Sequence, residues 1–242
     1  MKALILLFAL SASAQDLPKL KAQVMSADYR ADVKELARLR DELAKSPKDY
    51  LARYWSGFAS WRIAMNGANH GMKSDELQTN LKSAAADFYA SIQLKDDFAD
   101  GYAAASLVNG WLAVFVSSDP AALRERIALS STLLTKAKAL DPKNPRVLWG
   151  VGANYLYSPN GSIPKAIETY REMLKEAEKR GVDAASPLPD WGKPEALMSL
   201  AYAHMTQKPP DIDAAREEAR AALKVQPEWS YVRDNLMKQI DP

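Results

Sequence analysis

Short Ala/Leu-rich helical segments that stop at a proline recur along this 242-residue chain. Three of them are ELARLRDELAKSP (Glu35–Pro47), SSTLLTKAKALDP (Ser130–Pro142) and AREEARAALKVQP (Ala215–Pro227). A fourth, AAADFYASIQLKDD (Ala84–Asp97), keeps the apolar spacing but ends on aspartate instead of proline. Because a single helical repeat can bury its apolar face only against its neighbours, this pattern predicts an all-α protein built as a stacked array.

Residues 1–14 have the pattern of a cleavable signal peptide. Lys2 supplies a positive charge, residues 3–10 (ALILLFAL) form an apolar run too short to cross a bilayer, and Ala12–Ala14 places small residues before Gln15. We therefore expect cleavage after Ala14 and a periplasmic or secreted protein, with a buried N-terminal helix as the alternative for this segment. No later stretch approaches the run of about 20 apolar residues that a membrane-spanning helix needs, so we expect no integral membrane segment after cleavage.

Helical spacing dominates the remaining sequence, and runs of alternating β-branched residues are scarce. Leu36, Leu39 and Leu43, for example, follow one another at steps of three and four and form one apolar helix face. Prolines and Asn/Gly clusters interrupt the pattern repeatedly. We expect about nine helices in antiparallel pairs, which form one repeat domain over residues 28–242 after a flexible N-terminal segment at residues 15–27.

The two helices of each unit resemble those of tetratricopeptide repeats. That family carries a large residue and then Leu-Gly-x-x-Tyr on its first helix, and Ala-x-x-x-(Phe/Tyr)-x-x-Ala before a closing proline on its second. The matching stretches here are Leu148-x-x-Val151-Gly152-x-x-Tyr155 for a first helix and Ala166-x-x-x-Tyr170-x-x-Met173 for a second. A small residue on the first helix lets the two helices approach closely. The resemblance implies a right-handed tetratricopeptide-like α-solenoid that binds a protein or peptide partner.

Residue types that carry catalysis or bind metals are sparse. The chain has no cysteine, which excludes disulfides, thiolate metal sites and cysteine nucleophiles. Neither His70 nor His204 has a second ligand at the spacing that zinc sites use, and no phosphate-binding Gly-rich loop or Gly-x-Ser-x-Gly motif occurs. The 32 basic and 30 acidic residues form no long run of one sign, which disfavours a nucleic-acid partner. We therefore expect no enzyme activity, no cofactor and no metal site.

Aromatic residues and arginines recur on the expected first helices, whose inward sides line the concave groove of such arrays. Helical spacing places them on one stripe of each helix, and their composition is that of binding hot spots. The candidate partner-binding residues are Tyr54, Phe58, Trp61, Arg62, Trp111, Arg146, Trp149, Tyr157 and Tyr202. We expect an aromatic-lined groove that accepts an extended peptide or a flat apolar ligand. The alternative is that these side chains are buried between repeats, in which case the groove hypothesis fails.

Two proline-containing loops lie in the C-terminal half, residues 158–164 (SPNGSIP) and 186–194 (SPLPDWGKP). The prolines of the second loop lack amide donors and restrict the residues before them, which prevents a regular helix. Trp191 in this loop is either an anchor buried in the core or an exposed contact residue. We favour the anchor, because a proline-rich loop needs a side chain that holds it in place.

Two functions fit this sequence. The first is a non-catalytic periplasmic or secreted scaffold that recognises a protein or peptide partner through the aromatic groove. The second is a small-ligand-binding accessory protein of a transport system, comparable in general architecture to the T-components associated with TRAP-type transporters. An open groove favours the first function, and a deep enclosed pocket or a pore favours the second.

Overall fold

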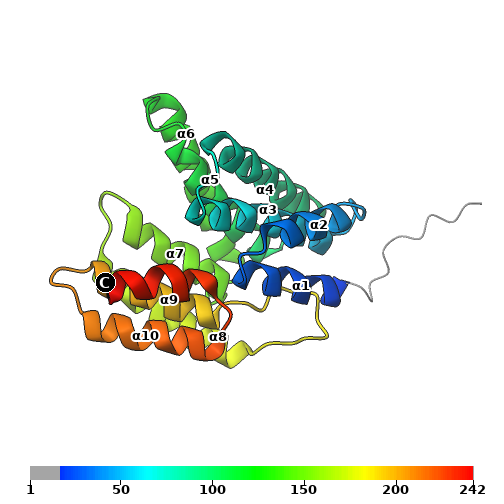
Figure 1. Cartoon of the computed structure of the whole chain (residues 1–242). Coiled ribbons are helices and arrows are strands. Elements are labelled where there is room, and N and C mark those ends of the chain that lie inside the picture. Colours follow the sequence, from blue (N-terminus) through cyan, green and yellow to red (C-terminus); the bar gives the residue numbers. More distant parts are fainter. Residues whose placement is uncertain (1–16, 242) are drawn as a thin grey trace, which may run out of the picture.

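The structure of the chain is a computed structural model that describes residues 17–241. These residues form eleven α-helices and one short π-helical segment, with no strand among them. The elements are α1 (Leu17–Tyr29), α2 (Val33–Leu43), α3 (Tyr50–Asn69), α4 (Ser74–Leu94), α5 (Ala99–Val114), α6 (Pro120–Leu140), α7 (Pro145–Tyr157), α8 (Ile163–Arg180), α9 (Lys193–Thr206), α10 (Ile212–Val225), η1 (Tyr231–Leu236) and α11 (Met237–Ile240). Consecutive helices pack together as antiparallel pairs (Figure 1). The predicted all-α array is confirmed, with eleven helices in place of about nine.

Helix α1 corrects the expectation of a flexible segment at residues 15–27. Residues 17–27 belong to this helix, because Leu17, Val24 and Ala27 repeat at helical spacing and are buried. The helix packs against α2 and α3, and that contact orders it. The helical array therefore includes α1 and does not start at residue 28. The expected signal peptide at residues 1–14 lies outside the described residues.

The recurring Ala/Leu segments are second helices of the pairs, namely α2, the end of α4, α6 and α10. Small residues let each first helix approach its partner. A Cβ added at Gly152 on α7 would clash with the ring of Tyr170 on α8, and one added at Gly57 on α3 would lie 3.0 Å from Phe88 on α4. These close approaches are the physical reason for the small residue in tetratricopeptide-type units.

The α5–α6 pair is longer than the pair that follows it. Helix α6 has 21 residues, and it begins where Asp119 caps the first turn ahead of Pro120. Helix α7 has only 13 residues and ends at Tyr157. The far end of α5–α6 therefore projects beyond its neighbours (Figure 1).

The end of α1 meets the segment that precedes η1, near the C-terminal end of the described residues. The ring of Tyr29 at the end of α1 packs edge-on against Trp229, just before η1, with the ring centroids 5.2 Å apart. The Tyr29 hydroxyl donates a hydrogen bond to Oε1 of Glu195 on α9 at 2.6 Å. The C-terminal segment packs against α10, and Figure 1 shows it in red on the same side of the molecule as the end of α1, in blue. The N-terminal helix of the array thus contacts its C-terminal part, which closes the array.

Candidate functional site

The candidate site is the inner face, formed by the sides of α1, α3, α7 and α9 that face one another. Its centre is closed by three tryptophans: Trp61 on α3, Trp149 on α7 and Trp191 in the α8–α9 loop. The ring centroid of Trp149 lies 5.5 Å from that of Trp61 and 5.4 Å from that of Trp191. The Trp149 indole N–H also donates to the Ser199 hydroxyl on α9 at 2.9 Å. The centre of the inner face is therefore filled by side chains.

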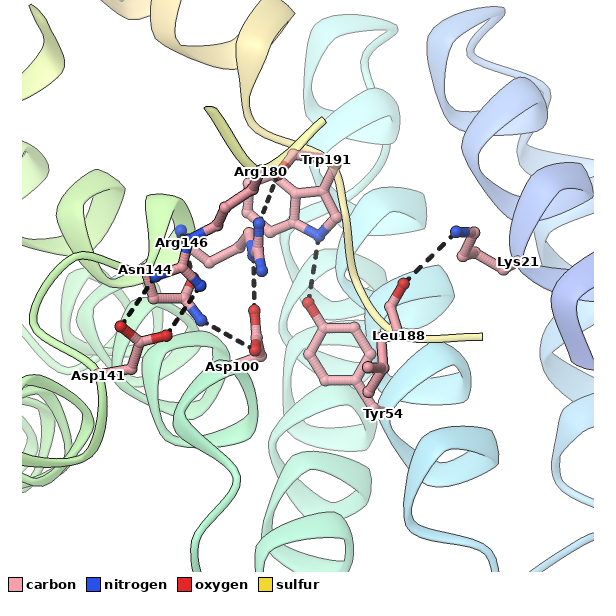
Figure 2. A network of polar contacts seen from close by, with 9 residues as sticks. All are labelled: Lys21, Tyr54, Asp100, Asp141, Asn144, Arg146, Arg180, Leu188 and Trp191. Atoms are coloured by element: carbon pink, nitrogen blue, oxygen red, sulfur yellow. Dashed lines mark hydrogen bonds and ion pairs between the residues drawn. The ribbon is translucent and has the colours of Figure 1, made fainter. Parts of the chain in front are cut away.

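The α8–α9 loop, residues 181–192, runs along the inner face between α1 and α3 (Figures 1 and 2). Three side-chain donors hold its main-chain carbonyls. Lys21 Nζ donates to the carbonyl of Asp183 at 2.9 Å, Trp55 Nε1 to that of Pro187 at 2.8 Å, and Arg146 Nη1 to that of Trp191 at 3.0 Å. Lys21 Nζ also pairs with the Asp190 carboxylate at 2.6 Å. A segment of the chain itself thus occupies this half of the inner face.

Trp191 anchors the loop. Its side chain is 5% exposed, and its indole N–H donates to the hydroxyl of Tyr54 at 3.2 Å. Burial raises the pKa of that hydroxyl well above its ordinary value, so Tyr54 stays protonated. Trp191 is thus a buried anchor and not an exposed contact residue, which confirms the prediction.

A buried polar network supports the anchor from α5 and α7 (Figure 2). The Arg146 guanidinium lies 6.0 Å from the Trp191 ring centroid and donates to the Asp100 carboxylate at 2.5 Å. The other oxygen of Asp100 accepts a hydrogen bond from the Asn144 amide at 3.0 Å. The same asparagine caps α7 by accepting from the N–H of Arg146. Arg146 therefore connects α5, α7 and the α8–α9 loop through its hydrogen bonds.

The structure corrects the groove hypothesis for four of the nine candidate residues. Each is at most 5% exposed, and the four are Tyr54, Phe58, Trp61 and Arg146. Tyr54, Phe58 and Trp61 are buried because the α8–α9 loop and α7 pack on this side of α3. Arg146 lies on α7 itself and is buried against Asp100 and Trp191. Phe58, for example, packs 5.7 Å from the Trp191 ring. These residues belong to the core and cannot contact a partner in this structure.

Two further candidates are partly buried. Trp149 closes the centre of the inner face, and Arg62 forms an ion pair with Asp28 at 2.6 Å. The Arg62 guanidinium also lies 5.6 Å from the Trp61 ring centroid. Because Asn66 donates to the same Asp28 carboxylate, the pair ties α3 to α1. Arg62 therefore lies beside the three tryptophans, and Trp149 lies among them.

The remaining part of the inner face carries a tyrosine cluster, defined as Tyr157, Tyr202 and Tyr231. The rings of Tyr157 and Tyr202 lie 6.2 Å apart, and Tyr157 is 66% exposed. Surrounding protein limits the access of water to Tyr157 and raises the pKa of its hydroxyl, and the neighbouring Tyr202 and Tyr231 raise it further. Tyr157 is thus the exposed member of the cluster, and Tyr202 and Tyr231 are partly buried.

Sequence reasoning missed one member of this cluster. Tyr231 lies on η1, in the segment that closes the array against α1, whereas the candidate residues were taken from the first helices of earlier units. The available signal was its position in the last expected helix, residues 229–240, two residues after Trp229.

Trp111 lies apart from the tyrosine cluster, on α5. It is 45% exposed, and Val114 and Ile127 on the same helix pair are 62% and 54% exposed. Their exposure follows from the short α7, which leaves the far end of α5–α6 uncovered. Trp111 is therefore a surface residue of this projecting end.

The chemistry of the described residues is limited. No group of three or more His, Cys, Asp or Glu residues that could hold a metal occurs among residues 17–241. No helix in the same part of the chain is long and apolar enough to cross a membrane. Glu195 is buried with its Oε2 atom unpaired, and burial raises the pKa of its carboxyl. This carboxyl accepts a hydrogen bond from the Tyr29 hydroxyl, whose ring packs against Trp229.

No protein-family model matches the chain, and no curated protein matches it. Among solved structures it is similar to the crystal structure of a thermophilic tetratricopeptide-repeat (TPR) protein from Thermus thermophilus, with a TM-score of 0.58 and 18% sequence identity. The similarity covers 95% of this chain and 100% of the other. The chain therefore has a tetratricopeptide-like fold, which confirms the predicted right-handed α-solenoid.

Proposed function

We propose that the chain is a non-catalytic scaffold that binds an extended segment of a partner protein at the tyrosine cluster. Stacked helical arrays present long inner surfaces that bind other chains, which supports this role. The signal-peptide pattern of residues 1–14 supports a periplasmic or secreted location for the mature protein.

The observation that carries the proposal is the uneven covering of the inner face. One half is covered by the α8–α9 loop, whose carbonyls accept hydrogen bonds from Lys21, Trp55 and Arg146. The other half presents Tyr157 and Tyr202 without such a covering segment. Tyrosines are typical of binding hot spots, because they bury a large area at a small loss of side-chain freedom, and Tyr157 is 66% exposed beside Tyr202.

The second function, small-ligand binding beside a transporter, has less support. A pore or deep pocket between the first helices would have to pass the centre of the inner face. The rings of Trp61, Trp149 and Trp191 fill that centre, with the Trp149 ring centroid 5.5 Å from that of Trp61 and 5.4 Å from that of Trp191. A flat apolar ligand would have to bind at the tyrosine cluster instead.

A displayed library of random peptides, selected on the purified chain, tests the proposal. We expect enrichment of peptides that bind the wild-type chain and lose binding to Tyr157→Ser. Because Tyr157 is 66% exposed, this substitution removes the contact surface without opening a cavity in the core.

Trp111→Ser is the matched control, since Trp111 is a similarly exposed aromatic residue on α5. The selected peptides should bind this variant as they bind the wild type. Peptides that bind Tyr157→Ser equally well, or that lose binding to Trp111→Ser alone, would place the binding surface elsewhere and refute the proposal.

A further inference from the structure

The chain contains three Asn-Gly pairs, Asn66–Gly67, Asn109–Gly110 and Asn160–Gly161. An asparagine before glycine is prone to spontaneous deamidation, because glycine has no Cβ that obstructs its own backbone nitrogen. This nitrogen loses its proton and forms a bond to Cγ of the asparagine, which gives a cyclic imide and releases the side-chain nitrogen as ammonia. Water then opens the ring and leaves aspartate or isoaspartate. The reaction requires that the glycine nitrogen can approach Cγ, and the structure differs at the three pairs in this respect.

The first two pairs are protected by helices. The first lies inside α3 and the second inside α5, where the glycine N–H groups belong to the helical hydrogen-bond pattern. The two asparagine side chains are also buried and bonded. Asn66 Nδ2 donates to the Asp28 carboxylate at 2.9 Å, and Asn109 Nδ2 donates to the Tyr89 hydroxyl at 2.7 Å. Reaction at either position therefore requires local unfolding of a helix interior.

The third pair lies in the loop between α7 and α8, outside both helices. Asn160 and Gly161 are both exposed. The Gly161 N–H donates to the carbonyl of Ser158 at 2.8 Å, which closes a short turn at the surface. A turn of this kind opens at a much smaller cost in free energy than the interior of a packed helix. The Gly161 nitrogen is therefore free to attack far more often than the other two.

Glycine is required at position 161 by the packing of the turn. A Cβ at this position would lie 2.2 Å from the carbonyl oxygen of Tyr155 and 2.8 Å from that of Ser158. Both neighbours are backbone atoms, which cannot move aside as the end of a flexible side chain can. The residue that makes Asn160 reactive is thus the residue that the turn needs.

The product carries a negative charge at the amino end of α8. Ser162 is the N-cap of this helix, and residue 160 lies two residues before it. A carboxylate is favoured near this end, because the helix dipole is positive there. Residue 160 also lies three residues after Tyr157, the exposed member of the tyrosine cluster. Deamidation therefore changes the charge of the loop that follows this tyrosine.

We propose that Asn160 is a site of spontaneous deamidation in the folded protein and that the turn accommodates the resulting aspartate. Asn66 and Asn109 react only when their helices unfold. The folded protein thus divides with time into two forms, which differ by one negative charge at residue 160. This modification does not depend on the proposed partner binding.

Peptide mapping by mass spectrometry tests the proposal after incubation of the full chain at mildly alkaline pH. Digestion at acidic pH prevents further reaction, and fragment spectra locate the exchange of NH2 for OH at each asparagine. In the folded chain we expect Asn160 to react at least about tenfold faster than Asn66 or Asn109. A difference of about 1.4 kcal/mol in the free energy of local opening is enough for this ratio. In urea the three sites should react at similar rates, because glycine follows each of them.

Asn160→Gln is the matched control, since its longer side chain disfavours ring closure. The second charge form of the folded chain should be absent from this variant in ion-exchange chromatography. Equal rates at the three sites of the folded chain overturn the proposal, as does a folded chain that stays intact at Asn160 while the chain in urea reacts there. A second charge form that persists in Asn160→Gln also overturns it.

Asn160→Asp installs the aspartate product directly. Its thermal unfolding, followed by circular dichroism, should occur at the wild-type Tm or above, because the charge lies near the amino end of α8. A lower Tm than that of the wild type overturns the inference that the turn accommodates the product.

Discussion

Replacement of Trp191 by alanine is the most direct test of how the inner face is built. The indole is 5% exposed and packs against Phe58 and Trp149, with ring centroids 5.7 and 5.4 Å away. Its N–H is bonded to the fully buried hydroxyl of Tyr54. If the loop is held mainly by this side chain, its removal destabilises the whole fold.

The structure allows an estimate of how much free energy of unfolding Trp191→Ala loses. Truncation of a buried Trp to alanine costs about 3–5 kcal/mol, through lost burial and the cavity that remains. The Tyr54 hydroxyl also loses its donor inside the core, which places Trp191→Ala at about 4 kcal/mol or more. In a chain of this size each kcal/mol lowers the Tm by about 2–4 °C, so we expect a decrease of about 8–16 °C.

Urea and thermal unfolding, followed by circular dichroism, measure this loss. Leu188→Ala is the matched control, because Leu188 lies on the same loop but is 48% exposed. It should change the free energy of unfolding by no more than about 0.5 kcal/mol. A loss below about 1 kcal/mol for Trp191→Ala, comparable to the control, would refute the claim that the loop is anchored in the core.

Three further changes test other parts of the fold. Burial raises the pKa of Glu195 above its ordinary value of 4.5, so the folded state holds the proton more tightly and stability falls as the pH rises above about 4.5. Glu195→Gln should match the wild type below about pH 4 and be more stable at about pH 8 in urea unfolding; a difference that is the same at both pH values contradicts this. Gly152→Ala should lower the free energy of unfolding by about 1–3 kcal/mol, because its Cβ would clash with a tyrosine ring of α8. Gly110→Ala, whose Cβ would have no atom nearer than 3.8 Å, should raise it by about 0.5–1 kcal/mol. Arg146→Met leaves the Asp100 carboxylate buried without its ion partner and should cost about 3–5 kcal/mol, and adding Asp100→Asn should restore part of the loss; equal losses for the single and double variants would contradict the pairing.

Helix pairing was predictable because its signals are local. Leu36, Leu39 and Leu43 repeat at helical spacing, and all three are buried in α2. Gly152 marked the close approach of α7 and α8, and the structure places the Tyr170 ring against it. Periodicity and residue size act over a few turns of one helix, so a single sequence is enough to predict which helix faces pair.

The side of a helix that meets a partner was not predictable in the same way. Tyr54, Phe58 and Trp61 form an aromatic stripe on α3, but the segment that covers the stripe contains Trp191, more than a hundred residues later. One signal was present: α3 carries apolar residues on all its sides, which is typical of a buried helix and not of a groove wall. Helix α1 was missed for a related reason, because its apolar face acquires a partner only when α2 and α3 are in place.

The contact between Tyr29 and Trp229 has a consequence for how this chain folds. In an open array each unit contacts only its neighbours, so units form locally and the ends fray independently. Here the two rings are separated by 200 residues in sequence yet lie 5.2 Å apart, and Lys21 pairs with Asp190 across a similar separation. Contacts between such distant residues slow folding, since a long loop must close before they form. Helix α1 therefore reaches its final packing only after the C-terminal half has folded, and the docking of these two parts is the last step of folding.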